Sequence, residues 1–125
     1  MFSQRVLLVS RDNNVTVLRQ KILEMAGYSV TAARYPAEAM AYLNTEKFDA
    51  VIIGYTVLPD EQRALCTQVR ADHPEVPILA IYKVIATSDC GATRYIHSLD
   101  GPDAMLAALK EMLASLIKST DGTSI

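Results

Sequence analysis

The chain alternates between short, continuous apolar runs and longer stretches in which apolar residues recur at helical spacing. Runs that are this short and this uniformly apolar are typical of strands buried on both faces of a parallel sheet. Five such strands are predicted, at residues 6–9, 28–32, 51–53, 78–81 and 94–97.

Four helices are predicted between and after these strands. Asp12 is suited to cap the first helix, and Gly27 stands where a helix-ending glycine is expected. The apolar stripe of this helix comprises Val15, Leu18, Ile22 and Met25. Pro36 opens the second helix, and the third is expected over residues 59–72, with Leu65, Cys66 and Val69 turned inward. The last is expected over residues 102–118, with an apolar stripe that contains Met105, Leu109, Met112 and Leu116.

Alternation of strands and helices predicts an open, doubly wound α/β sheet with helices on both faces. Five strands in a chain of this length fit the flavodoxin-like fold, with strand order 2-1-3-4-5. We expect a single domain over residues 1–118 and a flexible tail over 119–125. Only eight residues, Lys83–Cys90, separate Tyr82 from Gly91. A parallel crossover needs about a dozen, so the fourth helix of the fold is predicted to be shortened or missing.

Composition narrows the class of protein. The 125 residues are 50% hydrophobic and carry a net charge of -2, which gives no broad electrostatic footprint for nucleic acid or an anionic membrane. The two cysteines, Cys66 and Cys90, lie far apart and form no metal-ligand pair. No apolar run has the length of a membrane span, and the first residues do not look like a signal peptide. We therefore expect a soluble cytoplasmic domain without a metal or cofactor.

Five local patterns, in order and at matching spacing, resemble the receiver domain of bacterial response regulators, the CheY-like family. They are RVLLV at residues 5–9, LEMAGYSV at 23–30, FDAVII at 48–53, VPIL at 76–79 and GATRYI at 91–96. Together they span roughly residues 4–118. The resemblance implies the flavodoxin-like fold and a place in two-component signal transduction.

The resemblance also implies where the chemistry of an active receiver would lie. Such domains accept a phosphoryl group on an aspartate after the third strand, beside a magnesium ion held by two acids. A hydroxyl residue after the fourth strand and a lysine after the fifth bind the phosphoryl oxygens. In this chain the acceptor position is Gly54, and the acidic pair falls on Ser10 and Arg11. Tyr82 and Ser98 take the hydroxyl and lysine positions.

None of these replacements supplies the missing chemistry, so we expect a degenerate pseudo-receiver that is not an enzyme. Asp49 lies at the other end of the third strand, some five residues and ~16 Å from Gly54. Asp12 is better explained as a helix cap than as a metal ligand. Arg11 either fills the emptied acidic site with its guanidinium or points into solvent.

Tyr95 matches the aromatic position that swings between inward and outward states in active receivers. Tyr82 places a ring where that swing would end. One interpretation is that Tyr82 fills the vacated pocket as part of the core. The other is that Tyr82 holds Tyr95 outward and so fixes one state of the switch.

We expect the domain to act by protein–protein contact, independently of phosphorylation, as a stand-alone signalling module. The predicted contact surface combines the fifth strand and the last helix, because loss of the fourth helix would uncover this edge. Its residues are Tyr95, His97, Met105, Leu106 and Leu109. The partner is a signalling protein or, through the same face, a second copy of the chain. Neither nucleic acid nor a membrane is expected as a partner.

Two alternatives stay open. His97 could serve as a phosphoacceptor in an enzyme or phosphocarrier. The vacated pocket could instead bind a small anion through Ser10, Arg11, His97 and Ser98, at the strand carboxyl ends where ligands of such sheets bind.

Overall fold

The computed structural model describes residues 4–83 and 92–122, with the side chains of the last helix described as far as Ala114. The strands are β1 (Arg5–Val9), β2 (Ser29–Ala33), β3 (Ala50–Ile53), β4 (Ile78–Tyr82) and β5 (Arg94–His97). The helices are α1 (Asn13–Met25), α2 (Pro36–Thr45), α3 (Pro59–Asp72) and α4 (Gly101–Gly122). A 3-10 turn, η2 (Ser98–Asp100), joins β5 to α4.

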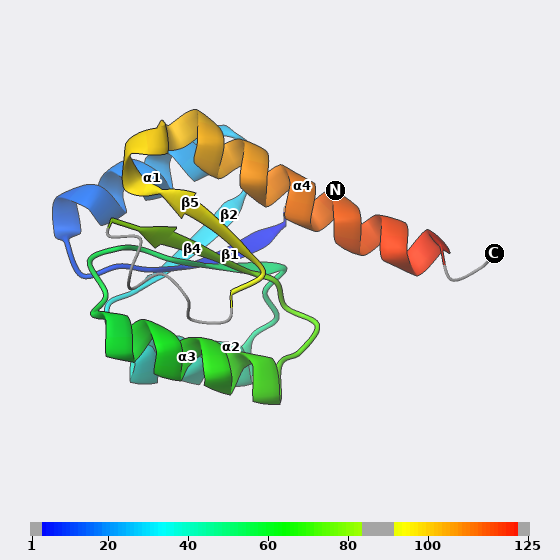
Figure 1. Ribbon diagram of the computed structural model, residues 1–125, viewed down its shortest axis with the longest axis horizontal. Coiled ribbons are helices and arrows are strands. Elements are labelled where there is room, and N and C mark those ends of the chain that lie inside the picture. The colour runs from blue at the N-terminus through cyan, green and yellow to red at the C-terminus, as the bar shows by residue number, and fades with distance from the viewer. Residues whose placement is uncertain (1–3, 84–91, 123–125) are drawn as a thin grey trace.

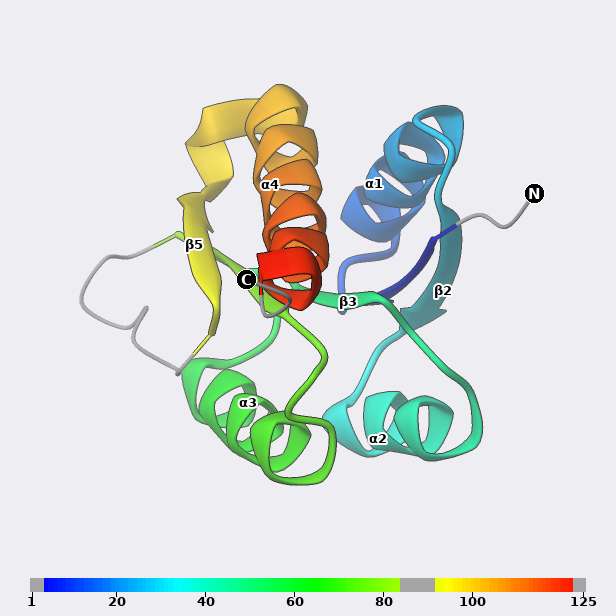
Figure 2. The same cartoon turned by 90° about the vertical axis from the view of Figure 1, so that its right-hand side faces the viewer.

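All strand pairs in the five-stranded sheet are parallel, in the order β2-β1-β3-β4-β5. Helices α1 and α4 cover one face of this sheet, and α2 and α3 cover the other (Figures 1 and 2). The predicted flavodoxin-like, doubly wound architecture and its strand order are therefore confirmed. The carboxyl ends of β1 and β3 meet at one edge, because Val9 pairs with Ile53.

The core consists of two layers, one on each face of the sheet. Alternate residues of one strand serve different layers, as the pleat of a strand requires. Leu7 and Val9 face α2 and α3, whereas Val6 and Leu8 face α1 and α4. Burial on both faces explains why the strands appear in the sequence as unbroken apolar runs.

Helix α1 forms where predicted, but its predicted inward stripe is only partly right: Val15 and Ile22 are half-buried, and Ile22 packs against the core layer of α1 and α4. Leu18 is 61% exposed and Met25 is 83% exposed, whereas Leu23 is fully buried. The line that faces the sheet runs through Arg19 and Leu23, which are four residues apart and so lie on one side of the helix. A charged side chain on the inner line hides that line from a search for apolar periodicity.

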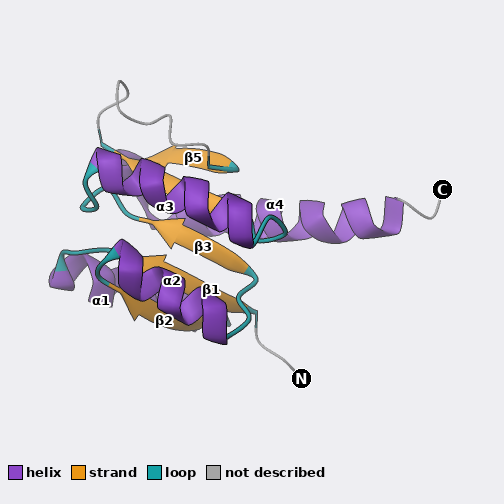
Figure 3. Ribbon diagram, turned by 90° about the horizontal axis from the view of Figure 1, so that it is seen from below, coloured by secondary structure: helices purple, strands orange, loops and turns teal. Residues whose placement is uncertain are grey.

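The last helix is longer than predicted. Helix α4 continues to Gly122, past the boundary predicted at residue 118, and its last turns project beyond the sheet (Figures 1 and 3). The segment predicted to hold a shortened fourth helix, including Cys90, lies outside the described residues apart from Lys83. In the described part of the chain, no helix combines the length and apolar character needed to cross a membrane.

Candidate functional site

Gly54 lies directly after β3, at the sheet edge where β1 also ends. Its backbone N–H donates to the carbonyl of Val9 at 2.8 Å. Its own carbonyl accepts from the side-chain amide of Gln62 at 3.0 Å, which leaves that buried amide nitrogen satisfied. Gly54 is thus a buried, hydrogen-bonded junction between β1, β3 and α3, and it carries no side chain.

The side chain of Arg19 reaches this junction from α1. A Cβ built on Gly54 would lie 2.9 Å from Arg19 Nη1, closer than real side chains approach. The Arg19 Cζ lies 5.3 Å from the centroid of the Tyr55 ring. Burial lowers the pKa of the Arg19 guanidinium, and the nearby Tyr55 hydroxyl opposes that shift. Arginine nevertheless stays charged in proteins, so a fixed cation stands beside position 54.

Sequence reasoning did not single out Arg19. The feature that could have revealed it is the four-residue spacing from Arg19 to Leu23, which places both on one helix side. Thr56 was also missed. It stands only two residues after Gly54, where a hydroxyl can reach the end of β1.

Ser10 and Arg11, the two residues after β1, are both tied to Thr56. The hydroxyls of Ser10 and Thr56 lie 3.1 Å apart, and Thr56 Oγ1 accepts from the backbone N–H of Arg11 at 3.0 Å. The Arg11 guanidinium pairs with Glu61 and lies 4.8 Å from the centroid of the Tyr35 ring. Arg11 therefore does not extend into solvent, and the cation beside Gly54 is Arg19.

The acids near this edge have structural partners. The Asp12 carboxylate accepts from the backbone N–H of Val15 at 3.0 Å, which confirms its predicted role as a helix cap. Glu61 pairs with Arg11. Asp49 lies at the opposite end of β3 and accepts from the backbone N–H of Arg5 at 2.8 Å. Within the described residues, no three His, Cys, Asp or Glu side chains converge as a metal site would require.

His97, at the end of β5, is held through both ring nitrogens. Nδ1 accepts from the backbone N–H of Leu99 at 3.0 Å, so the ring proton is assigned to Nε2. Nε2 then donates to the carbonyl of Lys83 at 3.1 Å. The ring also packs edge-on against Tyr82, with centroids 5.1 Å apart. His97 therefore joins the ends of β4 and β5, and no lone pair of its ring is left over.

Tyr82 and Tyr95 are both half-buried. The Tyr82 ring meets His97, so Tyr82 is a boundary residue and does not fill an interior pocket. Tyr95 packs against the core layer of α2 and α3, and its hydroxyl accepts from the backbone N–H of Ala92 at 3.0 Å. Whether Tyr82 influences a swing of Tyr95 stays a prediction.

Part of the predicted contact surface on β5 and α4 is buried in the core. Met105 is 2% exposed and Leu109 is fully buried, because both pack between α4 and the sheet. Neither side chain is available to a partner while the domain is folded. Tyr95, His97 and Leu106 are half-buried and remain accessible in part.

A cavity of about 390 Å³ opens between α1 and the segment that joins β5 to α4. Arg19, Tyr55, Lys83, His97 and Ser98 supply its polar groups, and the rest of the lining is apolar apart from Gly101. Of the four residues predicted to hold a small anion, His97 and Ser98 line this cavity, whereas Ser10 and Arg11 do not. The predicted anion site is therefore not assembled as the sequence suggested.

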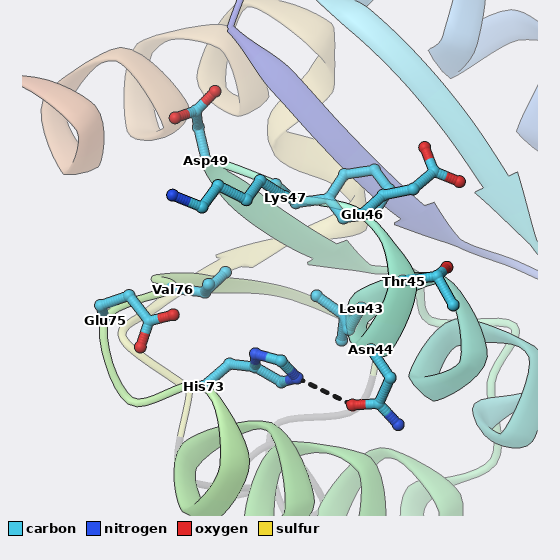
Figure 4. Close-up of a pocket in the computed structure, with 10 residues that line it drawn as sticks. Leu43, Asn44, Thr45, Glu46, Lys47, Asp49, His73, Glu75 and Val76 are labelled. Atoms are coloured by element: carbon cyan, nitrogen blue, oxygen red, sulfur yellow. Dashed lines mark hydrogen bonds between the residues drawn. The ribbon is translucent and has the colours of Figure 1, made fainter.

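A second cavity, of about 540 Å³, lies at the opposite edge of the sheet, where β3 and β4 begin (Figure 4). Its wall includes His73, whose Nε2 lies 3.1 Å from Asn44 Oδ1. Two of its acids are already engaged: Glu46 pairs with Arg5, and Asp49 accepts from the Arg5 backbone. This cavity is shaped by contacts that hold α2, α3 and β1 together.

The fold and the sequence are similar to those of known proteins. A CheY-like response regulator receiver domain from Methanospirillum hungatei superposes with a TM-score of 0.84 at 26% identity, covering 94% of this chain and 99% of that one. The chain has the fold of CheY-like receiver domains and is similar to them in sequence. The chemotaxis response regulator CheY4 of Vibrio cholerae shares the fold, with a TM-score of 0.77 at 22% identity over 88% of this chain and 98% of that one.

The sequence similarity extends to longer proteins. The chain is 24% identical to the response regulator MprA of Mycobacterium avium over 127 residues, which are 97% of this chain and 56% of the relative. The chain thus spans about half the length of the curated relatives it matches. No family model matches the sequence.

Proposed function

We propose that this receiver domain is a pseudo-receiver: it works in bacterial two-component signalling by protein–protein contact, without phosphorylation and without enzymatic activity. The observation that carries the proposal is the position of the Arg19 guanidinium next to Gly54. The position that resembles the phosphoacceptor has no side chain, and a guanidinium nitrogen lies 2.9 Å from where a Cβ would be.

The chemistry of phosphoryl transfer supports this proposal. The reaction needs a nucleophile in line with the phosphorus and a metal ion that neutralises the charge of the transferred group. The hydroxyls at this edge, Ser10 and Thr56, bond to each other. A hard divalent cation prefers several oxygen ligands, whereas Glu61 is paired with Arg11 and Asp12 caps α1.

The fixed charge of Arg19 suggests how such a domain keeps one conformation. In an active receiver the cation at this edge is a bound magnesium ion, and the phosphoryl group is added and removed. Here the cation is covalently part of α1 and lies against Tyr55. We infer that the edge is held in a single state, which is useful to a domain whose contacts do not depend on a signal at this site.

The contact surface that we propose lies along β5 and α4, with Tyr95 and Leu106 as its accessible members. Leu99, which lies between them in η2, is 88% exposed and adds apolar area to this side. Tyr95 packs on the α2–α3 side of the sheet and Leu106 on the α1–α4 side, so the two flank the β5 edge from opposite faces. Accessible apolar side chains at such an edge favour a protein partner. A signalling protein or a second copy of the chain would satisfy this surface.

Affinity capture with chemical crosslinking from a native lysate tests this function. The baits are the wild type, Leu106→Asp, and Leu58→Asp as a matched control, since Leu58 is 58% exposed at the start of α3. We expect one signalling protein, or the chain itself, to be captured by the wild type and by Leu58→Asp and lost with Leu106→Asp.

The same capture is repeated after incubation with acetyl phosphate and Mg²⁺, and the recovered amount is expected not to change. A partner that binds only after this treatment would overturn the independence from phosphorylation. Equal capture by all three baits would overturn the proposed surface.

A further inference from the structure

Two cationic side chains converge on one aromatic ring in the cavity between α1 and α4. Arg19 Cζ lies 5.3 Å, and Lys83 Nζ 5.6 Å, from the centroid of Tyr55. The Nη1 atom of Arg19 is buried and has no hydrogen-bond partner. Among residues 4–83 and 92–114, no carboxylate pairs with either cation.

Four other arginines of the described residues have a carboxylate partner, unlike Arg19. Arg5, Arg11, Arg63 and Arg94 each pair with a glutamate or an aspartate. Two cations beside one ring repel each other, and a buried guanidinium nitrogen without an acceptor lacks the hydrogen bond that it would donate to water. The ring of Tyr55 offsets part of this cost through cation–π attraction. An anion between the two cations would offset much more.

The cavity around these cations is built mainly from apolar side chains. Val15, Leu18 and Ile22 of α1 form one wall, and Ile96 and Met105 form the facing one. No aspartate or glutamate lines it. Its volume of about 390 Å³ suits a small organic molecule, since ligand cavities of proteins measure roughly 300–1,000 Å³. Apolar walls with a few convergent polar groups are typical of such sites.

We propose that this cavity binds a small organic acid, whose carboxylate lies between Arg19 and Lys83 and whose apolar body lies between α1 and the start of α4. A guanidinium can donate two parallel hydrogen bonds to a carboxylate, and Nη1 of Arg19, which is buried beside Gly54, has no partner for either of its N–H groups. This site shares Leu99 with the protein-contact surface, but its cations, Arg19 and Lys83, are not part of that surface, and the site goes beyond the function proposed above.

His97 has a positioning role in this site. Its Nε2 donates to the carbonyl of Lys83, which fixes the backbone from which the Lys83 side chain extends toward Tyr55. Both ring nitrogens are engaged, so neither is free to bind the anion. The Ser98 hydroxyl lines the same cavity and can donate a further hydrogen bond.

Titration of the ¹⁵N-labelled chain followed by NMR tests the site. The probes are 4-phenylbutyrate and octanoate, with 4-phenylbutan-1-ol as the uncharged match and inorganic phosphate as the match without an apolar body. The variants are Arg19→Gln and Lys83→Gln, and the control is Lys21→Gln, which removes an exposed cation from the same helix. Dispersed spectra confirm that each variant is folded, and Arg19→Lys keeps the charge should Arg19→Gln fail to fold.

We expect at least one carboxylate to shift the amide resonances around Arg19, Tyr55 and Lys83, and to bind about tenfold or more tightly than the alcohol and than phosphate. Arg19→Gln is expected to weaken binding about tenfold, and Lys21→Gln to leave it unchanged. Added salt should weaken binding, as screening of a charge pair requires.

Three results would overturn the proposal. One is that neither carboxylate shifts these resonances at millimolar concentration. Another is that the alcohol or phosphate binds as tightly as the carboxylates. Equal binding of the alcohol would show that the charge is not recognised, and equal binding of phosphate would show that the apolar body is not recognised. The third is that Lys21→Gln weakens binding as much as Arg19→Gln. None of these results bears on the contact surface of β5 and α4, which is tested separately.

Discussion

Arg19 Nη1 lies 2.9 Å from the point where a Cβ on Gly54 would stand, so a helix side chain occupies the space that a side chain after β3 would need. The two residues come from elements far apart in the chain and meet because β1 and β3 pair directly, with α1 packed over the same face. Because Gly54 has no side chain, the guanidinium of Arg19 can occupy this space.

Leu23 and Leu18 lie on the same helix but are expected to differ widely in their contribution to stability. Leu23→Ala removes a fully buried side chain from the α1–α4 layer and should lower the free energy of unfolding by about 2–5 kcal/mol. Leu18 is 61% exposed, so Leu18→Ala should change the free energy of unfolding by about 0.5 kcal/mol or less. Urea denaturation measures both. A larger loss for Leu18→Ala would mean that the inner line of α1 is the one predicted from the sequence.

Thr56 should be the hydroxyl that holds the ends of β1 and β3 together. Thr56→Val leaves the backbone N–H of Arg11 and the hydroxyl of Ser10 without their shared partner. We expect the free energy of unfolding to fall by about 1–3 kcal/mol. The matched control is Thr67→Val, whose exposed hydroxyl bonds within α3, to the Arg63 carbonyl. Equal effects of the two substitutions would remove any special role for Thr56.

Tyr28 makes stability depend on pH in the alkaline range. Burial raises the pKa of Tyr28 above its ordinary value. The unfolded chain therefore releases this proton first, and the stability that is fully present below the ordinary pKa is lost as the pH rises through the raised one. We expect Tyr28→Phe to decline less than the wild type between about pH 9 and pH 11. Denaturation midpoints across this range measure the difference, and parallel declines would contradict it.

The fold could be predicted almost completely from the sequence, because its strands are buried on both faces. Strands such as Val6–Val9 appear as unbroken apolar runs, and Pro36 and Pro59 mark helix starts by their fixed backbone geometry. The parallel order then follows from the alternation of strands and helices.

The site could be predicted only in part. Position along the strands placed Gly54, Ser10 and Ser98 at the correct edge, because carboxyl ends of parallel strands lie together. The contacts of Arg19 depend on the rotation of α1 about its axis, which apolar periodicity misjudged. Met105 and Leu109 were assigned to a contact surface because loss of the fourth helix was expected to uncover this edge, whereas both side chains pack between α4 and the sheet.

The most direct test of the central claim is intact mass spectrometry after incubation with acetyl phosphate and Mg²⁺. An active CheY-type receiver in the same buffer serves as the positive control, and Gly54→Asp, which places a carboxylate after β3, serves as the comparison. The mass of the wild-type chain is expected to stay unchanged while the control receiver gains a phosphoryl group. A phosphoryl adduct on the wild-type chain would contradict the proposal that this receiver-like domain works without phosphorylation.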